Sequence, residues 1–346
     1  MLNNLIRAKQ IIASATSFLK DSQNIRLIRN LVVAHPLSMD ESLRIAFCGR
    51  FNAGKSSLIN VLLDDNIVVS SPIPSTCAIT RIYYNKVYDY TVYEKTNNKI
   101  VAHIIDASGV QSNTVKKWAN KESCIYQVDI GVPSVFLSEG IELFDTPGLD
   151  DDIKMTTITK EHLSKSDFVF FVVDSLQLKD LRDLLMSYYH KLGRNVLFIA
   201  NKIDAIPNED DRNEIAELAQ VYYGDYFNPI SYKSEIFYVS SRCGRDGISE
   251  LFKFISDVLI RKKKRIIEIS RLSSFIFEIT EIKNSITNSI LKLQQKVLCT
   301  NDRLCKTEII DCIETMRSDK IIISNLIHDL KTLVLKLQIE DNDAIN

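Results

Sequence analysis

A glycine-rich stretch carries the clearest chemistry in this chain: residues 49–56 read GRFNAGKS, with the spacing G-x-x-x-x-G-K-S. An apolar run precedes it and a helical pattern follows, which is the context in which such a loop wraps phosphates. Gly49 and Gly54 let the backbone N–H groups of the loop, with Ala53 among them, approach phosphate oxygens. The start of the following helix adds partial positive charge. The stretch therefore predicts a phosphate-binding loop.

Two side chains at the end of this loop have specific expected roles. Lys55 is expected to reach the β- and γ-phosphates, and the Ser56 hydroxyl to bind Mg²⁺. Ser57 follows directly and is assigned to the same nucleotide site.

A second motif, 145-DTPG-148, ends an apolar run. Asp145 at the carboxyl end of a strand is placed to hold the metal or a water bound to it. The N–H of Gly148 can touch a γ-phosphate, because glycine lets the backbone approach closely. With the phosphate loop upstream, we prefer this interpretation to a plain Pro-Gly turn.

A third motif, 201-NKID-204, identifies the base. The Asp204 carboxylate can accept two hydrogen bonds from guanine N1–H and N2–H₂, whereas adenine offers no such pair. Sites of this kind discriminate by roughly 10⁴–10⁵. Lys202 is expected along the base plane, and Asn201 is expected to tie its loop to the phosphate loop. The motif order thus predicts GTP or GDP as ligand.

Three further residues complete the expected nucleotide site: two serines and a threonine. Ser240 and Ser241 follow the next strand, where a backbone amide would contact the guanine oxygen. A threonine must also reach Mg²⁺ and the γ-phosphate from the segment 72-PIPSTCAITRI-82. Thr76 and Thr80 are both candidates, and we prefer Thr80. The expected metal ligands are therefore Ser56, Thr80 and Asp145.

Apolar runs and helical patterns alternate between these motifs, which predicts an α/β fold with a mostly parallel sheet and helices on both faces. Residues 82–94 alternate like an antiparallel edge pair. The expected strands are 43–48, 141–145, 168–174, 196–202 and 236–241.

The chain ends have a different pattern. Residues 1–34 lack Gly and Pro and show apolar residues at helical spacing, and the same holds from 265 onward, with a polar break at 300–303. Amphipathic helices of this kind must bury their apolar stripes, so we expect a helical bundle built from both ends. The expected division is 1–40 and 263–346 for the bundle and 41–262 for the nucleotide-binding domain.

Composition argues against a disulfide-rich, a secreted or a membrane-spanning protein. The net charge is −1, with 45% hydrophobic and 25% charged residues, as in ordinary globular chains. Seven scattered cysteines favour a reducing compartment with mostly buried thiols. No signal peptide or membrane-spanning run is expected, which places the chain in the cytoplasm and leaves peripheral membrane association open. The basic run 261–265 is interpreted as a solvated helix start, so nucleic acid is not an expected partner.

The order GRFNAGKSS, PSTCAITR, DTPGLDD, NKID and VSS resembles the translation-factor-related P-loop GTPases. Residues 62–80 and 128–151 are similar to the dynamin-like family, in a minimal or bacterial-type form. The resemblance implies GTP hydrolysis at the β–γ bond with Mg²⁺, in a GTPase domain coupled to a helical bundle. It also implies activation by dimerisation across the nucleotide face, in a homodimer or with a related GTPase.

Leu149 follows Gly148, where small signalling GTPases carry a glutamine that orients water, and a leucine cannot do so. The resemblance implies that Asn52 helps to hold K⁺ beside the phosphates. The expected catalytic residues are Asn52, Lys55, Thr80 and Gly148. One alternative stays open: Asn52 bonds only a neighbouring loop. Arg50 could act as an internal arginine finger, but directly after the first glycine we expect it to point to solvent or to a partner.

Two other functions fit the same motif order. One is an RNA- or ribosome-assembly GTPase of the Era-like type, although residues 265–346 contain no glycine and therefore no GxxG loop of a KH domain. The other is a GTP-dependent adaptor with little hydrolysis.

Overall fold

The computed structural model describes residues 3–34, 41–68, 79–96, 99–105, 125–148, 162–163, 166–174, 195–206, 208–223, 236–300 and 302–342. The chain divides into two compact units. Glu41–Ile266 form one, which we call the sheet unit, and Met1–Asp40 with Ile267–Asn346 form the other, which we call the helical unit.

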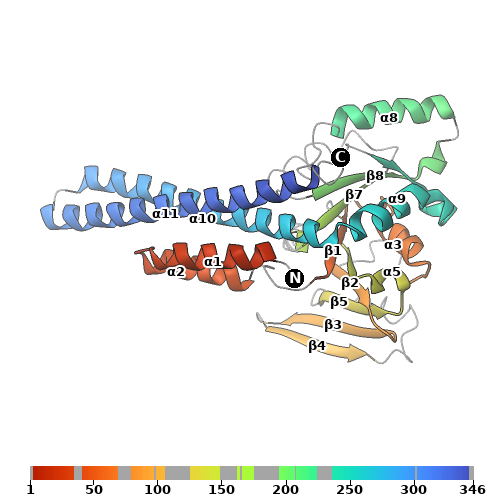
Figure 1. Ribbon diagram of the computed structural model, residues 1–346, viewed down its shortest axis with the longest axis horizontal. Coiled ribbons are helices and arrows are strands. Elements are labelled where there is room, and N and C mark those ends of the chain that lie inside the picture. Colours follow the sequence, from red (N-terminus) through yellow and green to blue (C-terminus); the bar gives the residue numbers. More distant parts are fainter. Residues whose placement is uncertain are drawn as a thin grey trace. The chain divides into compact units, whose positions relative to one another are not determined.

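A mixed nine-stranded sheet forms the centre of the sheet unit, in the order β4-β3-β5-β2-β6-β1-β7-β8-β9 (Figure 1). The strands are β1 (Leu43–Cys48), β2 (Ile79–Tyr84), β3 (Asp89–Thr96), β4 (Lys99–Ile105), β5 (Ile125–Val132), β6 (Ile141–Asp145), β7 (Phe168–Asp174), β8 (Asn195–Asn201) and β9 (Phe237–Tyr238). β1 pairs in parallel with β6 and β7, and β7, β8 and β9 continue in the same sense.

Helices lie on both faces of this sheet (Figure 1), which confirms the expected α/β class. They are α3 (Lys55–Leu63), α5 (Val135–Ser138), α8 (Glu209–Tyr223) and α9 (Ser249–Phe254), with the short turns η3 (Ile203–Ala205), η5 (Ser241–Cys243) and η6 (Asp246–Ile248) and the π-helical segment η7 (Ile255–Ile260). Since both faces are covered, the central strands are continuous apolar runs. In β7, Phe168–Val173 are buried throughout.

The segment 82–94 is where the sequence-based expectation is wrong. β2 and β3 do not pair with each other, because β5 lies between them, parallel to β2 and antiparallel to β3. β5 brings Val128, Ile130 and Val132 into the core. Burial of these side chains outweighs the local hairpin that the alternation suggested.

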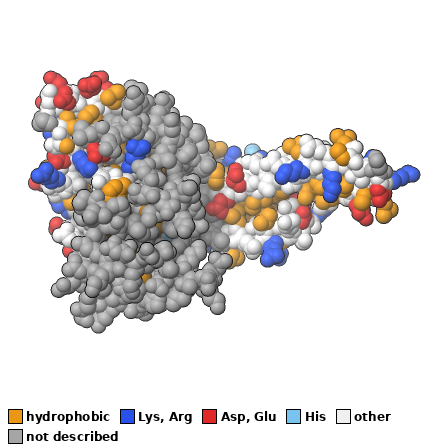
Figure 2. Space-filling view, turned by 180° about the vertical axis from the view of Figure 1, so that it is seen from behind, with side chains coloured by type: hydrophobic (Ala, Val, Ile, Leu, Met, Phe, Trp, Pro, Cys, Tyr) orange, Lys and Arg blue, Asp and Glu red, His pale blue; other side chains and the backbone are white. Residues whose placement is uncertain are grey.

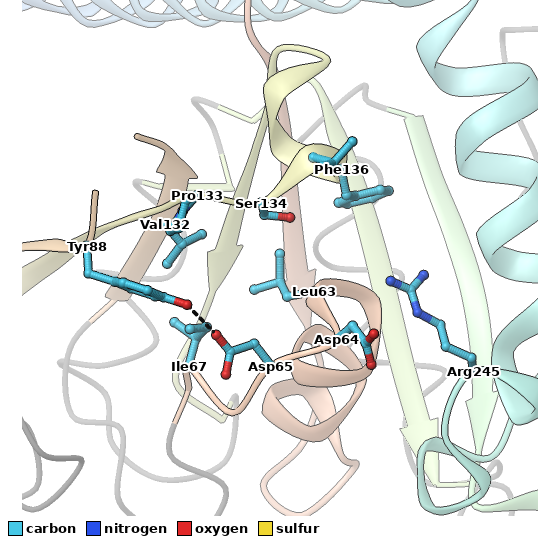
Figure 3. Close-up of a pocket in the computed structure, with 11 residues that line it drawn as sticks. Leu63, Asp64, Asp65, Ile67, Tyr88, Val132, Pro133, Ser134, Phe136 and Arg245 are labelled. Carbon is cyan, nitrogen blue, oxygen red and sulfur yellow. Dashed lines mark hydrogen bonds between the residues drawn. The ribbon is translucent and has the colours of Figure 1, made fainter. Parts of the chain in front are cut away.

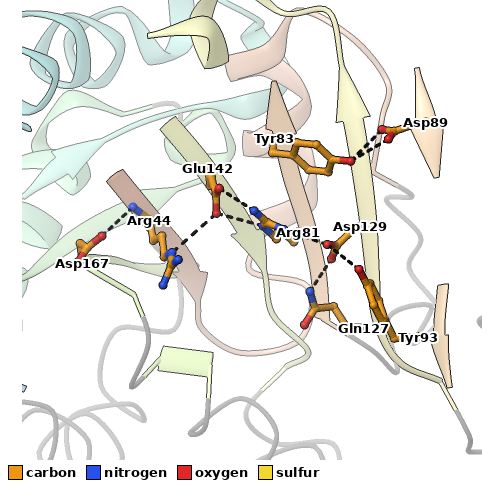
Figure 4. Close-up of polar contacts among 9 residues, drawn as sticks. All are labelled: Arg44, Arg81, Tyr83, Asp89, Tyr93, Gln127, Asp129, Glu142 and Asp167. Carbon is orange, nitrogen blue, oxygen red and sulfur yellow. Dashed lines mark hydrogen bonds and ion pairs between the residues drawn. The ribbon is translucent and has the colours of Figure 1, made fainter. Parts of the chain in front are cut away.

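An ion-pair network fixes β2 against its two neighbours (Figure 4). The Arg81 guanidinium donates to both carboxylate oxygens of Glu142 on β6, at 3.0 and 2.7 Å, and to Asp129 on β5 at 3.0 Å. The two carboxylates raise the pKa of Arg81 further above its usual value, against the effect of burial. A bidentate arginine pair has a demanding geometry, so it specifies the register of β2 on β6.

The helical unit contains α1 (Asn3–Ser17), α2 (Ser22–Ala34), α11 (Arg303–Asn342) and most of α10 (Lys263–Cys299). Both chain ends thus contribute helices to one unit, as expected. The N-terminal pattern is broken into two helices at residues 18–21. The Asp21 carboxylate accepts the N–H of Gln23 at 2.8 Å, which caps the start of α2.

Two buried carboxylates attach the N-terminal helices to α10 and α11. Asp319 is fully buried and accepts the N–H groups of Lys20 and Asp21, at 2.8 and 3.0 Å, and the Asn24 amide at 2.9 Å. Glu268 accepts the N–H and the side-chain amide of Asn4 at 3.1 and 3.0 Å. We call these bonds the carboxylate clamps. Each places a charge where backbone N–H groups would otherwise lack partners.

The surface of the helical unit carries apolar side chains among Lys and Arg (Figure 2). The most exposed apolar residues of its two long helices are Leu298 at 83% and Leu304 at 73%. No helix in the part of the chain that the structure describes combines the length and apolarity that a membrane crossing requires. The expectation of mostly buried thiols is wrong for the described cysteines: Cys48 is buried, but Cys243, Cys299, Cys305 and Cys312 are exposed. The last three lie on long helices, only one stripe of which is buried.

Replacing Asp319 by Ala should loosen the turn between α1 and α2. Three donors then lose a buried acceptor, which costs roughly 1–3 kcal/mol. Amide hydrogen exchange at Lys20 and Asp21 should accelerate about 10- to 100-fold. Asp311→Ala, at an exposed position of α11, is the matched control and should leave these rates unchanged. Equal exchange in the two variants would contradict the clamp.

Candidate nucleotide-binding site

The loop between β1 and α3 has the backbone that a phosphate cradle needs. Gly49 has φ 149° and Gly54 has φ 91°, both in the region that favours glycine. A β-carbon on Gly49 would collide with the Val172 carbonyl oxygen, and one on Gly54 with the Asn201 amide. No side chain caps α3 at Gly54, so the helix start presents N–H groups toward the loop.

Lys55 begins α3 and is nearly buried. Its ammonium donates to the carbonyl oxygens of Gly49 and Arg50, at 3.1 and 2.9 Å. The positive charge therefore lies within the loop that the sequence assigned to phosphate. Ala53 is buried in the same loop, and Ser57 is half-buried on α3.

Ser56 and Asp145 meet at the metal position that the sequence proposed. The Ser56 hydroxyl donates to Asp145 Oδ2 at 2.5 Å. Asp145 is fully buried, and its Oδ1 has no hydrogen-bond partner among the described residues. Burial raises the pKa of Asp145, while Lys55 and the Ser56 bond oppose that shift. A hydroxyl beside a carboxylate with a spare oxygen is a donor set that suits Mg²⁺.

The strand that ends at Asp145 is held by its next residue. The Thr146 hydroxyl donates to the Phe47 carbonyl oxygen at 2.8 Å, which joins the end of β6 to β1. Gly148 is buried two residues further on. Leu149 lies outside the described residues.

Thr80 lies in β2, opposite Asp145 in the antiparallel ladder, and is buried. Directly opposed residues of an antiparallel pair project to the same face, so the Thr80 and Asp145 side chains share one face of the sheet. Thr76, the other candidate, lies outside the described residues.

Asn201 joins the two nucleotide loops, and the predicted tie to the phosphate loop is confirmed. Its amide nitrogen donates to the Ala53 carbonyl oxygen at 2.9 Å and to the Ser241 hydroxyl at 3.3 Å. Its amide oxygen accepts the N–H of Ser241 at 3.1 Å. One buried side chain therefore holds together the loops assigned to phosphate and base.

Lys202 has φ 66°, the left-handed conformation, and its ammonium lies 2.8 Å from Asp174 at the end of β7. Asp174 is not among the site residues expected from the sequence. The only signal was an aspartate that closes the apolar run 168-FVFFVVD-174. This ion pair fixes the stem of Lys202.

Asp204 and Ser240 are also brought together. The Ser240 hydroxyl donates to Asp204 Oδ1 at 2.6 Å and accepts the N–H of Cys243 at 3.3 Å. Oδ2 of Asp204 has no partner among the described residues. From the sequence we expected a backbone amide of the serine pair to act here, and this side-chain bond was not expected.

Asn52 projects from the phosphate loop and does not join these contacts. Its side chain is exposed, and its φ of 61° is one that asparagine tolerates better than most residues. Arg50 is partly buried in the same loop. Asn52 is thus open to solvent beside the loop.

Part of the chain is similar to known protein families. Residues 45–203 match the model of the Dynamin family. An uncharacterised Caldicellulosiruptor protein is 30% identical over 49% of this chain and 41% of its own length. Dynamin-like protein A of Bacillus subtilis is 27% identical over 53% of this chain and 15% of its own. The chain therefore spans less than half the length of these two relatives.

A solved structure extends the likeness to the fold of nearly the whole chain. It is described as an oligomerised bacterial dynamin pair that senses and tethers membranes. It covers 93% of this chain and 52% of its own, with a TM-score of 0.53 and 20% identity. This likeness concerns the fold alone.

The buried carboxylate gives a test of the metal position. A raised native pKa means that ionisation of Asp145 costs stability, and this cost appears as pH rises above the unfolded value of 3.8. Asp145→Asn should therefore raise the melting temperature of the nucleotide-free protein at pH 8. The gain should shrink as pH falls toward about 4.

Thermal unfolding followed by circular dichroism at pH 8, 6 and 4.5 measures this effect. Asp210→Asn, in the exposed first turn of α8, is the control and should show no such trend. A variant that is less stable than the parent at pH 8 would refute the assigned cost. Mg²⁺-dependent nucleotide binding should be lost in the same Asp145 variant.

Proposed function

We propose that this chain, whose nucleotide-binding unit is a dynamin-like GTPase domain, binds GTP with Mg²⁺ and hydrolyses it at the β–γ bond. The observation that carries the proposal is the Asn201 side chain, which bonds both the phosphate loop and Ser241. A ligand that fills both loops must carry phosphates and a base. The motif match over residues 45–203 supports the same activity.

Asp204 selects guanine in this proposal. Ser240 holds one carboxylate oxygen, so the aspartate presents a fixed edge to the base. Guanine supplies two donors to that edge, whereas adenine would leave the carboxylate poorly paired. Lys202, anchored by Asp174, lies with its stem along the base.

Mg²⁺ would be held through Ser56, Asp145 and Thr80, and when bound it neutralises charge on the β- and γ-phosphates. Lys55 would exchange its bonds to the loop carbonyls for phosphate oxygens. Gly148 would offer its N–H to the γ-phosphate. Thr80 shares the face of Asp145, which supports it as the switch threonine.

Hydrolysis needs a group that Leu149 cannot supply. We assign this part to Asn52, which helps to hold a monovalent cation, K⁺, beside the phosphates. Positive charge placed there stabilises the charge that develops in the transition state. The exposure of Asn52 supports completion of the site by a second GTPase domain.

Dimerisation across the nucleotide face, with a second copy or a related GTPase, would couple turnover to movement of the helical unit. The exposed apolar residues of α10 and α11 support a partner or peripheral membrane contact there. The bacterial dynamin pair, described as tethering membranes, is consistent with both parts of this proposal.

Asp204→Asn should exchange guanine for xanthine. The amide can donate to xanthine O2 and accept from its N1–H, but it cannot accept two bonds from guanine. We expect GTP affinity to fall by roughly 10³-fold or more and xanthosine triphosphate to bind instead. Competition titration with a fluorescent nucleotide measures both. Asp210→Asn is the control, and a variant that keeps its preference for GTP would overturn the base assignment.

Asn52→Gly should remove the side chain while keeping the positive φ. Turnover in K⁺ should fall roughly 10- to 100-fold toward the Na⁺ rate, because one ligand of the cation is lost. GTP affinity should stay within about twofold, since no phosphate contact is removed.

Steady-state hydrolysis in K⁺ and in Na⁺, at increasing protein concentration, provides the measurement. A steep rise with concentration supports dimerisation. Equal rates in the two salts, or an unchanged rate in Asn52→Gly, would remove the cation from the proposal. A flat and very slow rate in the parent protein would favour an adaptor.

A further inference from the structure

A hollow of about 380 Å³ lies at the carboxyl-terminal end of α3, at the opposite end of that helix from the phosphate loop (Figure 3). α3 has nine residues, so its two ends are about 13 Å apart at 1.5 Å per residue. All its lining residues belong to the sheet unit. The hollow is therefore distinct from the site described above.

The floor and the rim of this hollow differ in chemistry. Leu63, Val132 and Phe136 supply an apolar floor. Asp64 and Asp65 stand on the rim, directly after the end of α3. The carbonyl end of the helix adds partial negative charge at the same place.

The two carboxylates are presented in different ways. Asp65 is fixed, because one of its oxygens accepts the Tyr88 hydroxyl at 2.8 Å (Figure 3) and the other accepts the N–H of Asn66 at 2.7 Å. The bond to Asp65 raises the pKa of Tyr88, so the tyrosine remains a donor. The Asp64 carboxylate is exposed and has no partner among the described residues.

Arg245 also lines the hollow, but its charge is already engaged. It donates to the Leu62 carbonyl oxygen at 3.0 Å, and its guanidinium lies 4.2 Å from the centre of the Phe252 ring. The arginine thus closes the end of α3, and no ion pair joins it to Asp64 or Asp65 among the described residues. Two carboxylates and one guanidinium line the hollow, so its rim keeps a net negative charge.

We propose that this hollow is a docking site for a basic side chain, arginine first, carried by a segment of a partner protein. The aliphatic stem would cover Leu63 and Phe136, and the charged end would reach Asp64 and Asp65. Arginine is favoured over lysine because its planar fork can meet two carboxylates at once. Arginines seated in pockets of this kind are frequent anchors of protein interfaces.

A second hollow of about 330 Å³ shares Asp64, Asp65 and Arg245 but is also lined by Ser57 and Ser241 of the nucleotide site. The proposed docking site is therefore the first hollow alone. Val135, which lines the first hollow and is 82% exposed, gives a docked segment a further apolar contact.

A fluorescence anisotropy titration tests the proposal on the full chain. The probe is a short dye-labelled peptide with one central arginine between leucines. Its matched controls replace the arginine by lysine or by citrulline, which keeps the shape and removes the charge. We expect the arginine peptide to bind at about millimolar concentration, the lysine peptide more weakly, and the citrulline peptide roughly tenfold more weakly or not at all.

Asp64→Asn and Asp65→Asn should each weaken the arginine peptide by roughly tenfold, because a charge-assisted hydrogen bond is lost. Both positions are exposed, so folding should be preserved, and unchanged thermal unfolding verifies this. Asp211→Asn on the exposed first turn of α8 is the matched control and should bind as the parent does.

Three results would overturn the proposal: equal binding of the citrulline peptide, unchanged affinity in both aspartate variants, or no binding up to about 5 mM. Analytical sedimentation of the chain without peptide tests whether a second copy of the chain fills the hollow instead. Self-association that Asp64→Asn abolishes would mean that a second copy fills the hollow, and the separate partner would be abandoned.

Discussion

Parallel pairing around β1 is the constraint on which the candidate site depends. Because β6, β1, β7 and β8 run in one direction, their carboxyl ends meet at a single edge of the sheet. The phosphate loop, Asp145, Asp174 and Asn201 follow or end these strands. The backbone hydrogen bonds between these strands thereby bring together four segments that are distant in the chain. Hydrogen bonds such as the one from Asn201 to Ala53 then tie neighbouring loops together.

The cost of this arrangement is concentrated at Asp145. A carboxylate with no exposed surface and an oxygen without a described partner is unfavourable in the interior of the sheet unit. Lys55 and Ser56 compensate only in part, since the pKa remains raised. A cation bound by Asp145 would offset the remaining cost of burying its charge. A buried charge that lowers stability is often found at a binding site. The burial of Asp145 is therefore consistent with the metal-ligand role expected from the sequence.

The sequence was informative wherever chemistry fixes spacing. A phosphate cradle needs glycines at set positions, and Gly49 and Gly54 do have the positive φ that such a loop requires. A guanine-selecting loop needs its aspartate, and this role of Asp204 stays a prediction. The class of fold followed from alternating strands and helices. The insertion of β5 could not be foreseen, because the alternation at 82–94 also suits a hairpin, and only distant partners such as Asp129 and Arg81 decide between them. The contact of Asp174 with Lys202 depends on side-chain geometry that local patterns do not encode.

The carboxylate clamps bear on the order in which the chain acquires its structure during synthesis. Lys20 and Asp319 are 299 residues apart, and ribosomes add about 5–20 residues each second. The turn between α1 and α2 must therefore wait roughly 15–60 s for its acceptor. During that time the apolar faces of the two helices lack α11, so they must remain solvated or be shielded by other contacts. The sheet unit lies in the chain between the N-terminal helices and α11. Its strands can therefore form before α11 has been synthesised.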